Sequence, residues 1–359
     1  MAILKIANQP RDYAWGSLEL IPDLLGIAPN GKPQAEIWLG THPGSLAQVV
    51  DDESGTLRDR VGELGFLVKI LAAGKPLSIQ AHPTKEHAAK RFAEGYPGYT
   101  DPNHKPELIA AISEFRALCG FRPIGEISAD LDTLAQSSDV FQPWLAAFAA
   151  EGIAGATSWA LAQSAETVSE LGRVSKILAP ARAGLIQDLL AQAGEDVGVL
   201  VSLLMNYVVL QPGEALFLPA GNIHAYLSGL GVEVMAASDN VLRGGLTAKP
   251  VDIPELLTVL DFSELAEPRA QAKELVRGLT KYSVSVDDFQ VYRVEPSGSN
   301  LLIDLNLRGR AILVCISGEI TLSTSREDSM TLRRGEACYF DAANYFSVLG
   351  AGTGYLAMG

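Results

Sequence analysis

The stretch that most constrains this fold runs from residue 213 to His224 and reads GEALFLPAGNIH. Its apolar segment Ala215–Leu218 has the length of a short strand, and Pro219 ends that strand because it cannot donate to a β-ladder. Gly221 then permits the tight turn that re-aims the chain into a second strand. We therefore expect His224 to point into the interior of a β-barrel.

An earlier strand carries polar residues on one face. In LSIQAHP, Ser78, Gln80 and His82 alternate with Ile79 and Ala81, so that in a strand the three polar side chains share one face. An amide and an imidazole on a buried face need hydrogen-bond or metal partners. This strand therefore predicts a functional site.

Three more polar residues, His104, Lys105 and Glu107, follow after a loop rich in Gly, Pro, Asp and Asn. Amide, imidazole and carboxylate groups are all possible metal ligands. The two stretches together thus offer three ligand types, and His224 supplies a fourth donor from the distant turn.

Length and composition indicate an ordinary globular protein. The chain has 359 residues, enough for two or three domains, with 48% hydrophobic and 19% charged residues. Its formal net charge of -14 argues against a general nucleic-acid-binding protein, because such binding neutralises phosphates with clustered Lys and Arg.

The opening MAILKIANQPRDYAWG lacks the pattern of a secretory signal, and no later run approaches about 18 uninterrupted apolar residues. We expect a cytoplasmic protein without a membrane partner, and a monomer, because no heptad seam is visible. Cys119, Cys315 and Cys338 are expected to be buried free thiols, since their number is odd and their spacing is not that of a metal site.

Apolar residues recur at spacings of three and four between about residues 122 and 206, which predicts amphipathic helices. Strands and tight turns precede and follow this block, and a further short helix is expected over 250–262. Many short strands after about residue 280 indicate a sandwich or barrel. The helical runs are 139–152, 165–179 and 183–194, and the later strands are 282–286, 289–294, 311–318 and 337–340.

The chain then repeats its most constraining stretch. Residues 335–346 read GEACYFDAANYF and match 213–224 at Gly, Glu, Ala and Asn. Asp341, Ala343 and Phe346 stand where the first copy has its Pro, its second Gly and its His. We infer a second barrel that binds no metal.

The Gly, Pro, Gly and His spacing of 213–224 resembles the second signature of the cupin family. With DYAWG, AEIWLGTHP, FLVKIL, LSIQAHP, NHKPE, GNIHAYL and SDNVLRGGLTAK, it makes the chain resemble the type I phosphomannose isomerases, zinc enzymes that interconvert mannose 6-phosphate and fructose 6-phosphate. The likeness covers nearly the whole chain and is weakest in the last third.

This resemblance implies a mainly β protein with a helical insertion, built from two cupin (jelly-roll) barrels and an α-helical domain. The implied domains are a catalytic cupin domain over 1–121 and 207–262, a helical insertion over 122–206, and a cupin-like domain without metal over 263–359.

The resemblance also implies that Gln80, His82, Glu107 and His224 hold one zinc ion per chain. These residue types suit zinc, although the neutral amide of Gln80 is a weaker donor than a third His. One carboxylate among four ligands leaves a formal charge of about +1 on the site, which favours an oxyanion.

Interconverting an aldose and a ketose moves a proton between two carbons through an enediolate, so a base is required. The candidates are His104, Lys105, Glu233 and Asp239. His104 and Lys105 precede Glu107 so closely that we expect both beside the metal. Each candidate is equally compatible with a supporting role that holds a neighbouring ligand in place.

Arg243, in SDNVLRGGL, is the strongest candidate for binding the phosphate or the developing negative charge, because its planar fork pairs well with anionic oxygens. Outside such a motif an Arg commonly makes a surface ion pair. Gly244 and Gly245 would let the backbone approach a ligand.

Five residues are candidates for substrate binding. By the resemblance, Lys69 and Ser78 lie around the sugar phosphate, and Tyr226 shares the strand face of His224. Trp15 and Glu36 are candidates for the pocket rim, with a buried Trp and a solvated Glu as the alternative. His42 and His87 have no comparable case and are expected to be structural or solvated.

Three other functions remain open. A cupin dioxygenase would use iron with three His and one Glu, which Gln80 argues against. The chain could instead be a non-catalytic sugar-phosphate-binding cupin. It could also be an epimerase, or an isomerase of another phosphosugar.

Overall fold

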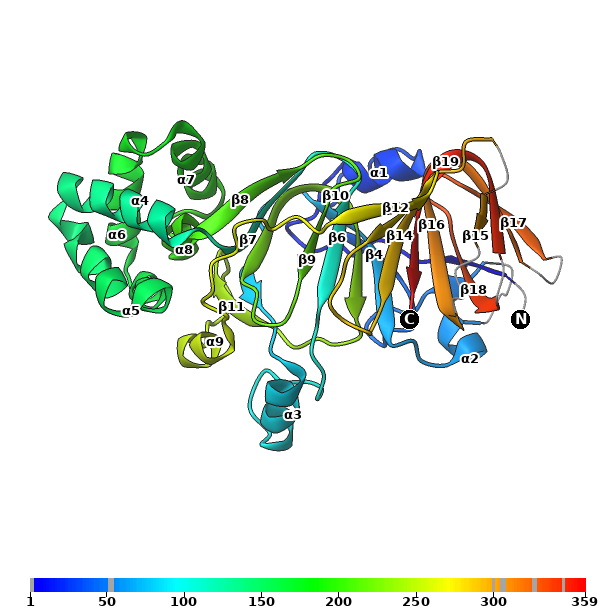
Figure 1. Cartoon of the computed structure of the whole chain (residues 1–359), viewed down its shortest axis with the longest axis horizontal. Coiled ribbons are helices and arrows are strands. Elements are labelled where there is room, and N and C mark those ends of the chain that lie inside the picture. Colours follow the sequence, from blue (N-terminus) through cyan, green and yellow to red (C-terminus); the bar gives the residue numbers. More distant parts are fainter. Residues whose placement is uncertain (1–2, 51–54, 299–300, 304–307, 325–327, 344–345) are drawn as a thin grey trace.

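The computed structural model describes residues 3–50, 55–298, 301–303, 308–324, 328–343 and 346–359. The molecule is elongated, with a helical block at one end and two β-rich regions beside it (Figure 1). The prediction of a mainly β protein with a helical insertion is confirmed.

The first sheet is organised around β10 (His224–Ala236). One part of β10 pairs antiparallel with β4 (Phe66–Ala73) and β6 (Glu107–Ala111), and the other with β5 (Ile79–Ala81) and β7 (Phe115–Phe121). This long strand therefore brings together the segments that contain the predicted metal ligands. The other strands of the sheet are β2 (Glu36–Leu39), β8 (Met205–Leu210), β9 (Ala215–Leu218) and β11 (Leu242–Gly245).

The second sheet is built mostly from the last third of the chain, with β16 (Arg308–Thr324) and β19 (Phe346–Met358) paired along its centre. It also takes in β1 (Leu4–Ala7), which pairs with β18 (Ala337–Ala343) and so ties the start of the described chain to its end. The other strands are β3 (Gln48–Val49), β12 (Ala272–Val276), β13 (Leu279–Tyr282), β14 (Gln290–Val294), β15 (Leu301–Ile303) and β17 (Ser329–Arg333).

Neither sheet closes into a ring through the backbone pairings of the described residues. The register of β10 against β7 shifts between Tyr226 and Ser228. Such an irregularity bends a strand, which lets the two parts of β10 pair with different neighbours.

β4 is apolar on both faces except at Lys69, because it lies between two cores. Val68 and Ile70 pack with Tyr355 and other residues in a core between the two sheets, whereas Leu71 packs inside the first sheet. Because side chains alternate along a strand, Lys69 lies on the same inner face as Leu71. β4 therefore separates two cores, and its one charged residue faces the interior of the first sheet.

The repeated stretch at 335–346 lies partly in the apolar core of the second sheet. Phe346 packs edge to face on Phe340, and Asp341 accepts a hydrogen bond from the Tyr339 hydroxyl at 2.6 Å. The side chain of Ala343 and position 344 lie outside what the structure describes.

The helical block packs on the far end of the first sheet. Its apolar residues share a core with Ile79 and Ala81, so the face of β5 that carries those two side chains is covered by helices. α5 (Gln142–Leu161) buries Trp144, Phe148 and Ile153 in this core, and it kinks at Gly152, where φ is +62°. The block consists of α4 (Ile124–Ser137), η1 (Asp139–Phe141), α5 (Gln142–Leu161), α6 (Ala165–Val174), η2 (Ser175–Ile177), α7 (Pro180–Ala193) and α8 (Gly198–Leu204).

Some local predictions need correction. The strand expected over 282–286 lies earlier, because β13 ends at Tyr282, and the Ser283 N–H makes one further bond in the same register, to the carbonyl of Gln271. α3 (Lys85–Ala93) was not predicted, because only Ala88 of this helix is buried and no apolar period marks it. The helices outside the block are α1 (Leu20–Leu25), α2 (Leu57–Val61), α3 and α9 (Ile253–Val259).

Within the described residues, no single helix is long and apolar enough to cross a membrane. The bent pair 139–161 and 165–177 meets that test by length and composition only. Phe141, Trp144 and Leu171 of this pair pack in the protein core.

Candidate active site

A cavity of about 920 Å³ opens between the first sheet and the helical block. Strands β2, β4, β5, β6, β10 and β11 line it together with the segments 13–15, 75–78 and 246–249 and the end of α7. Its polar and charged lining includes Glu36, Lys69, Lys75, Ser78, Gln80, Lys105, Glu107, Gln192, Asp196, Glu233, Asp239, Arg243, Thr247 and Lys249.

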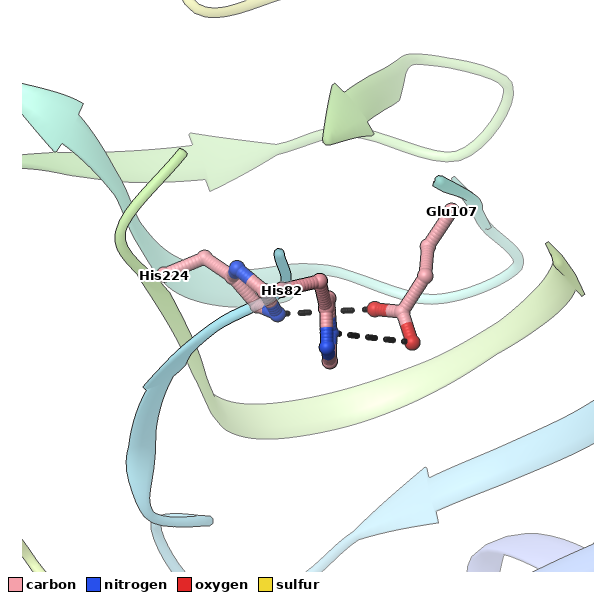
Figure 2. A group of neighbouring side chains, drawn as sticks. All are labelled: His82, Glu107 and His224. Carbon is pink, nitrogen blue, oxygen red and sulfur yellow. Dashed lines mark ion pairs between the residues drawn. The ribbon is translucent and has the colours of Figure 1, made fainter. Parts of the chain in front are cut away.

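His82, Glu107 and His224 converge from three segments that lie far apart in the sequence (Figure 2). The Nε2 atoms of His82 and His224 each lie 3.4 Å from a different oxygen of Glu107. All three side chains are buried, so water does not solvate them. The predicted metal ligands are therefore brought together around the carboxylate.

The hydrogen bonds of the two imidazole rings determine which ring nitrogen carries a proton. His82 Nδ1 lies 2.8 Å from the carbonyl of Asn240, and His224 Nδ1 lies 3.0 Å from that of Asn222. A carbonyl only accepts, so each Nδ1 carries a proton, and in a neutral ring Nε2 is then a bare acceptor. Burial lowers the pKa of His82 to about 4, which keeps that ring neutral.

Both Nε2 atoms and Glu107 Oε2 are buried and have no hydrogen-bond partner. Three acceptors that face one another without a donor leave their lone pairs unsatisfied. A cation between them would satisfy all three, and imidazole and carboxylate donors suit a divalent transition metal. The residues therefore fit a metal ion.

Gln80, on β5, lies next to the cluster of His82, Glu107 and His224. It pairs with His224 in the register of β5 and β10, and its side chain lines the cavity. Ile79 and Ala81 are fully buried on the other face against the helical block, which turns Gln80 toward the site. The alternation predicted for this strand is confirmed.

A buried ion-pair network forms the wall next to the cluster. The Lys69 ammonium lies 3.0 Å from Glu233 and 3.4 Å from Glu36. The second oxygen of each carboxylate accepts one more hydrogen bond, from the Tyr226 hydroxyl at 2.9 Å and from Trp38 Nε1 at 2.8 Å. Every member of this network is therefore satisfied and held in one orientation.

The charges in this network stabilise one another. Burial alone would lower the pKa of Lys69, but the carboxylates of Glu233 and Glu36 raise it above its ordinary value. Burial raises the pKa of Glu233, although the Lys69 ammonium opposes that rise. Burial also raises the pKa of Tyr226 well above its ordinary value, so the hydroxyl keeps its proton.

Lys105 lies beside the metal cluster, with its ammonium 3.0 Å from Glu107 Oε1. Burial alone would raise the pKa of Glu107, but the Lys105 ammonium holds it well below its usual range. Glu107 is therefore ionised and available as a ligand at neutral pH.

Arg243, Ser78 and Trp15 all line the cavity. Arg243 is half-buried and pairs with Gln80 in the register of β11 and β5. No acidic side chain pairs with it among the described residues, and burial lowers its pKa from the ordinary value. Trp15 stacks on Tyr13 with ring centroids 5.8 Å apart and is half-buried.

Asp239 reaches the cavity from an exposed position, where His42 Nε2 lies 3.3 Å from its carboxylate. His42 Nδ1 accepts the Gly44 N–H, so the ring proton sits on Nε2 and is donated to Asp239. This hydrogen bond lowers the pKa of Asp239.

His104 is not among the residues that line the cavity, contrary to the expectation that it would lie beside the metal. Its Nε2 lies 3.0 Å from both oxygens of Asp288, in the segment before β14. The ring is therefore turned toward the C-terminal part of the chain. His87 bonds to Glu255 at 2.6 Å and is also not among the residues that line the cavity.

The helical block contributes residues that the sequence did not predict. Gly245, with φ +124°, packs so closely on Gly198 that a Cβ would lie 2.5 Å from the Gly198 Cα. Asp196 then accepts the backbone N–H groups of Leu246 at 2.6 Å and Thr247 at 3.2 Å. The tight approach at Gly245 is thus to a helix and not to a ligand.

Other contributors were also missed by sequence reasoning. Lys75, Gln192 and Lys249 line the cavity, and Asn222 and Asn240 orient the two imidazoles through their carbonyls. A backbone acceptor leaves no mark in side-chain chemistry, so these two positions carried no direct signal. Lys75 lay within the polar stretch around Ser78 and could have been noted.

Residues 3–124 match the family model for the phosphomannose isomerase type I catalytic domain. The chain is 36% identical to the mannose-6-phosphate isomerase of Escherichia coli (strain K12) over 392 residues, which cover 98% of each chain. It is similar in structure to a mutant phosphomannose isomerase from Salmonella typhimurium, with a TM-score of 0.90, 33% identity and coverage of 100% of this chain and 99% of that one. It is equally similar, at a TM-score of 0.90 and 32% identity over the same shares of both chains, to a mannose 6-phosphate isomerase bound with zinc and yttrium.

Proposed function

Because the chain belongs to the type I phosphomannose isomerase family, we propose that it is an aldose–ketose isomerase that interconverts mannose 6-phosphate and fructose 6-phosphate. The observation that carries this proposal is the group of three buried, unsatisfied acceptors on His82, Glu107 and His224 beside a large polar cavity. A sugar phosphate entering that cavity would meet both a metal position and Arg243, which has no acidic partner in the part of the chain that the structure describes.

We propose that the metal is zinc, one ion per chain, held by Gln80, His82, Glu107 and His224. The four donors are oxygen and nitrogen atoms of the kinds that zinc accepts. When bound, zinc would act as a Lewis acid on the two sugar oxygens between which the carbonyl moves.

The cavity residues would hold the sugar and move the proton. Arg243 would pair with the phosphate or with the charge that develops on the enediolate oxygens, because no acidic side chain of the described residues forms an ion pair with it. Lys105, Glu233 and Asp239 line the cavity and stay the candidates for transferring the proton between C1 and C2. His104 falls behind them because Asp288 already holds its ring.

The network around Lys69 would keep one wall of the cavity rigid. Because Trp38 and Tyr226 occupy the outer oxygens of Glu36 and Glu233, neither carboxylate can swing without losing a buried hydrogen bond. We also propose that 1–121 and 207–262 form the catalytic cupin domain, 122–206 a helical insertion that closes one side of the cavity, and 263–359 a cupin-like domain without metal.

The isomerase proposal is tested by mixing purified, zinc-loaded protein with fructose 6-phosphate and following mannose 6-phosphate. Product formation supports the proposal. Binding of fructose 6-phosphate without turnover would instead favour a non-catalytic sugar-phosphate-binding cupin, and turnover of a different phosphosugar alone would reassign the substrate.

The zinc site is tested by metal analysis of purified variants. We expect His82→Ala and His224→Ala to lose zinc and activity, because each substitution removes an imidazole nitrogen that would bind the metal. Gln80→Ala should bind zinc more weakly but still measurably, since its amide is the weakest donor. Full zinc occupancy in all three variants would contradict this ligand set.

A further inference from the structure

Asn240 lies between β10 and β11 and is completely buried. Its backbone carbonyl accepts the hydrogen bond from His82 Nδ1 at 2.8 Å. Its side chain points to the loop 100–103, which leads directly into Lys105 and Glu107. Asn240 therefore contacts both the His82 ring and the loop that precedes Glu107.

Every hydrogen-bonding position of the Asn240 amide is used by that loop. Oδ1 accepts the Thr100 N–H at 2.9 Å, and Nδ2 donates to the carbonyls of Asp101 at 2.8 Å and Asn103 at 2.9 Å. One N–H and two carbonyls can be matched only by an amide, since a carboxylate lacks donors and an alkyl group lacks both. The chemistry of this position is thus specified by the loop it holds.

Neighbouring residues strengthen the same connection. Ser238 Oγ donates to Asp101 Oδ1 at 3.0 Å, and the backbone N–H of Asp239 donates to Asp101 Oδ2 at 3.1 Å. Asp239 lines the cavity, and its hydrogen bond to Asp101 fixes its backbone to the loop that Asn240 also contacts. Segments 100–103 and 238–240 are therefore linked by hydrogen bonds. The cavity residues next to these segments are Lys105, Glu107 and Asp239.

We propose that Asn240 is a positioning residue for the metal centre, which fixes the His82 ring and the chain entering Glu107 in one arrangement. A ligand ring is aimed by the hydrogen bond at its other nitrogen, and the spacing of two ligands is set by the chain that carries them. Asn240 controls both, although neither of its side-chain groups contacts the cluster. The inference rests on the proposed metal centre but not on turnover of any sugar.

The test compares Asn240→Ala with Asn206→Ala. Asn206 is the matched control, because its Nδ2 also bridges carbonyls of separate segments, those of Cys119, Phe121 and Leu265. Two readouts need no substrate: Zn²⁺ affinity of the purified metal-free protein by competition with a chromogenic chelator, and the visible absorption spectrum of the Co²⁺-loaded protein, which reports ligand geometry.

We expect Asn240→Ala to weaken Zn²⁺ binding about 10- to 100-fold, the usual effect of losing an outer partner of a metal ligand, and to alter the Co²⁺ spectrum. Asn206→Ala should leave both unchanged while losing comparable thermal stability. A Zn²⁺ affinity within twofold of the wild type and an unchanged spectrum in Asn240→Ala would overturn the proposal.

If Asn240→Ala does not fold, Asp101→Asn decides the question at the partly exposed end of the same set of hydrogen bonds. Weaker Zn²⁺ binding with a shifted Co²⁺ spectrum supports the proposal, and wild-type values for both reject it. Because neither readout uses a sugar, a wild-type protein that binds zinc but fails to isomerise fructose 6-phosphate would reject the proposed function alone.

Discussion

Arg243 differs from the other basic residues beside the metal cluster in having no acidic partner among the described residues, whereas Lys69 and Lys105 are each paired. A half-buried guanidinium without a counter-ion favours an anion from solution. We expect Arg243→Ala to lower kcat/KM about 100-fold or more, the usual effect of losing one preorganised donor, while zinc content stays at the wild-type value.

Arg243→Lys is the matched control, because it keeps the positive charge and loses the planar fork. Its activity should fall between those of the wild type and Arg243→Ala. Steady-state kinetics with fructose 6-phosphate and metal analysis measure both effects. An unchanged rate in Arg243→Ala would show that the guanidinium takes no part in the reaction.

The residues of the site were predictable where local geometry sets the direction of a side chain. Gln80 and His82 alternate along a strand, and the turn after Pro219 aims His224, so both halves of the cluster could be read from the sequence. His104 could not be placed, because its direction is set by Asp288, which lies 184 residues away in the sequence.

Among the elements, α3 is unusual because it lies between two proposed metal ligands and yet buries only Ala88. A buried carboxylate on α9 holds it. Glu255 accepts hydrogen bonds from His87 at 2.6 Å, Arg91 at 2.6 Å and Tyr99 at 2.8 Å. α3 therefore depends on polar contacts with one residue more than on apolar packing.

This dependence makes α3 sensitive to acid. Burial alone would raise the pKa of Glu255, but the hydrogen bonds from Arg91, His87 and Tyr99 hold it below its ordinary value. A carboxyl with a lowered pKa in the folded state contributes stability above its unfolded pKa and loses it as pH falls through the folded value. We therefore expect the protection factors of the α3 amides in hydrogen–deuterium exchange to fall below about pH 4.

Glu255→Gln should destabilise α3 at neutral pH by about 1.5–3 kcal/mol, the range for hydrogen bonds to a charged group, and should remove the acid dependence. The control is Glu94→Gln, because Glu94 pairs with the same Arg91 at 3.0 Å but from an exposed position. Exposed pairs contribute about 0–1 kcal/mol, so α3 exchange should change little in that variant. Equal effects of the two substitutions would contradict the assignment.

Elements were predictable where an apolar period or a strong turn marked them. β9 was expected over Ala215–Leu218 and is found there, because a Gly and a Pro bracket its apolar residues. α3 was missed because a polar helix has no apolar period to detect. The strand expected at 282–286 alternates suitably, yet β13 lies at Leu279–Tyr282, because its pairing with β12 and β14 sets its bounds and that pairing is not encoded locally.

For the molecule as a whole, the core between the two sheets is the main connection. Ile70 of the first sheet is 1% exposed and packs there with Tyr355 and Val314 of the second. Ile70→Ala should cost about 2–5 kcal/mol, and both sheets should still unfold in one transition, because each covers an apolar face of the other.

Urea unfolding followed by far-UV circular dichroism and by Trp fluorescence measures both quantities. Val276→Ala serves as the control, since Val276 is 48% exposed on β12 and its change should stay within about 0.5 kcal/mol. Two separated transitions in Ile70→Ala would show that the sheets fold independently.

The pairing of β1 with β18 also determines when the second sheet can complete its folding during synthesis of the chain. β1 covers Leu4–Ala7 and β18 begins at Ala337, so a ribosome must deliver nearly the whole chain before this pair can form. His224 likewise emerges only after the entire helical block that follows Glu107. Pairings between such distant residues fold slowly, and the nascent chain meanwhile exposes the apolar outer face of β4, which is the surface that a chaperone would bind.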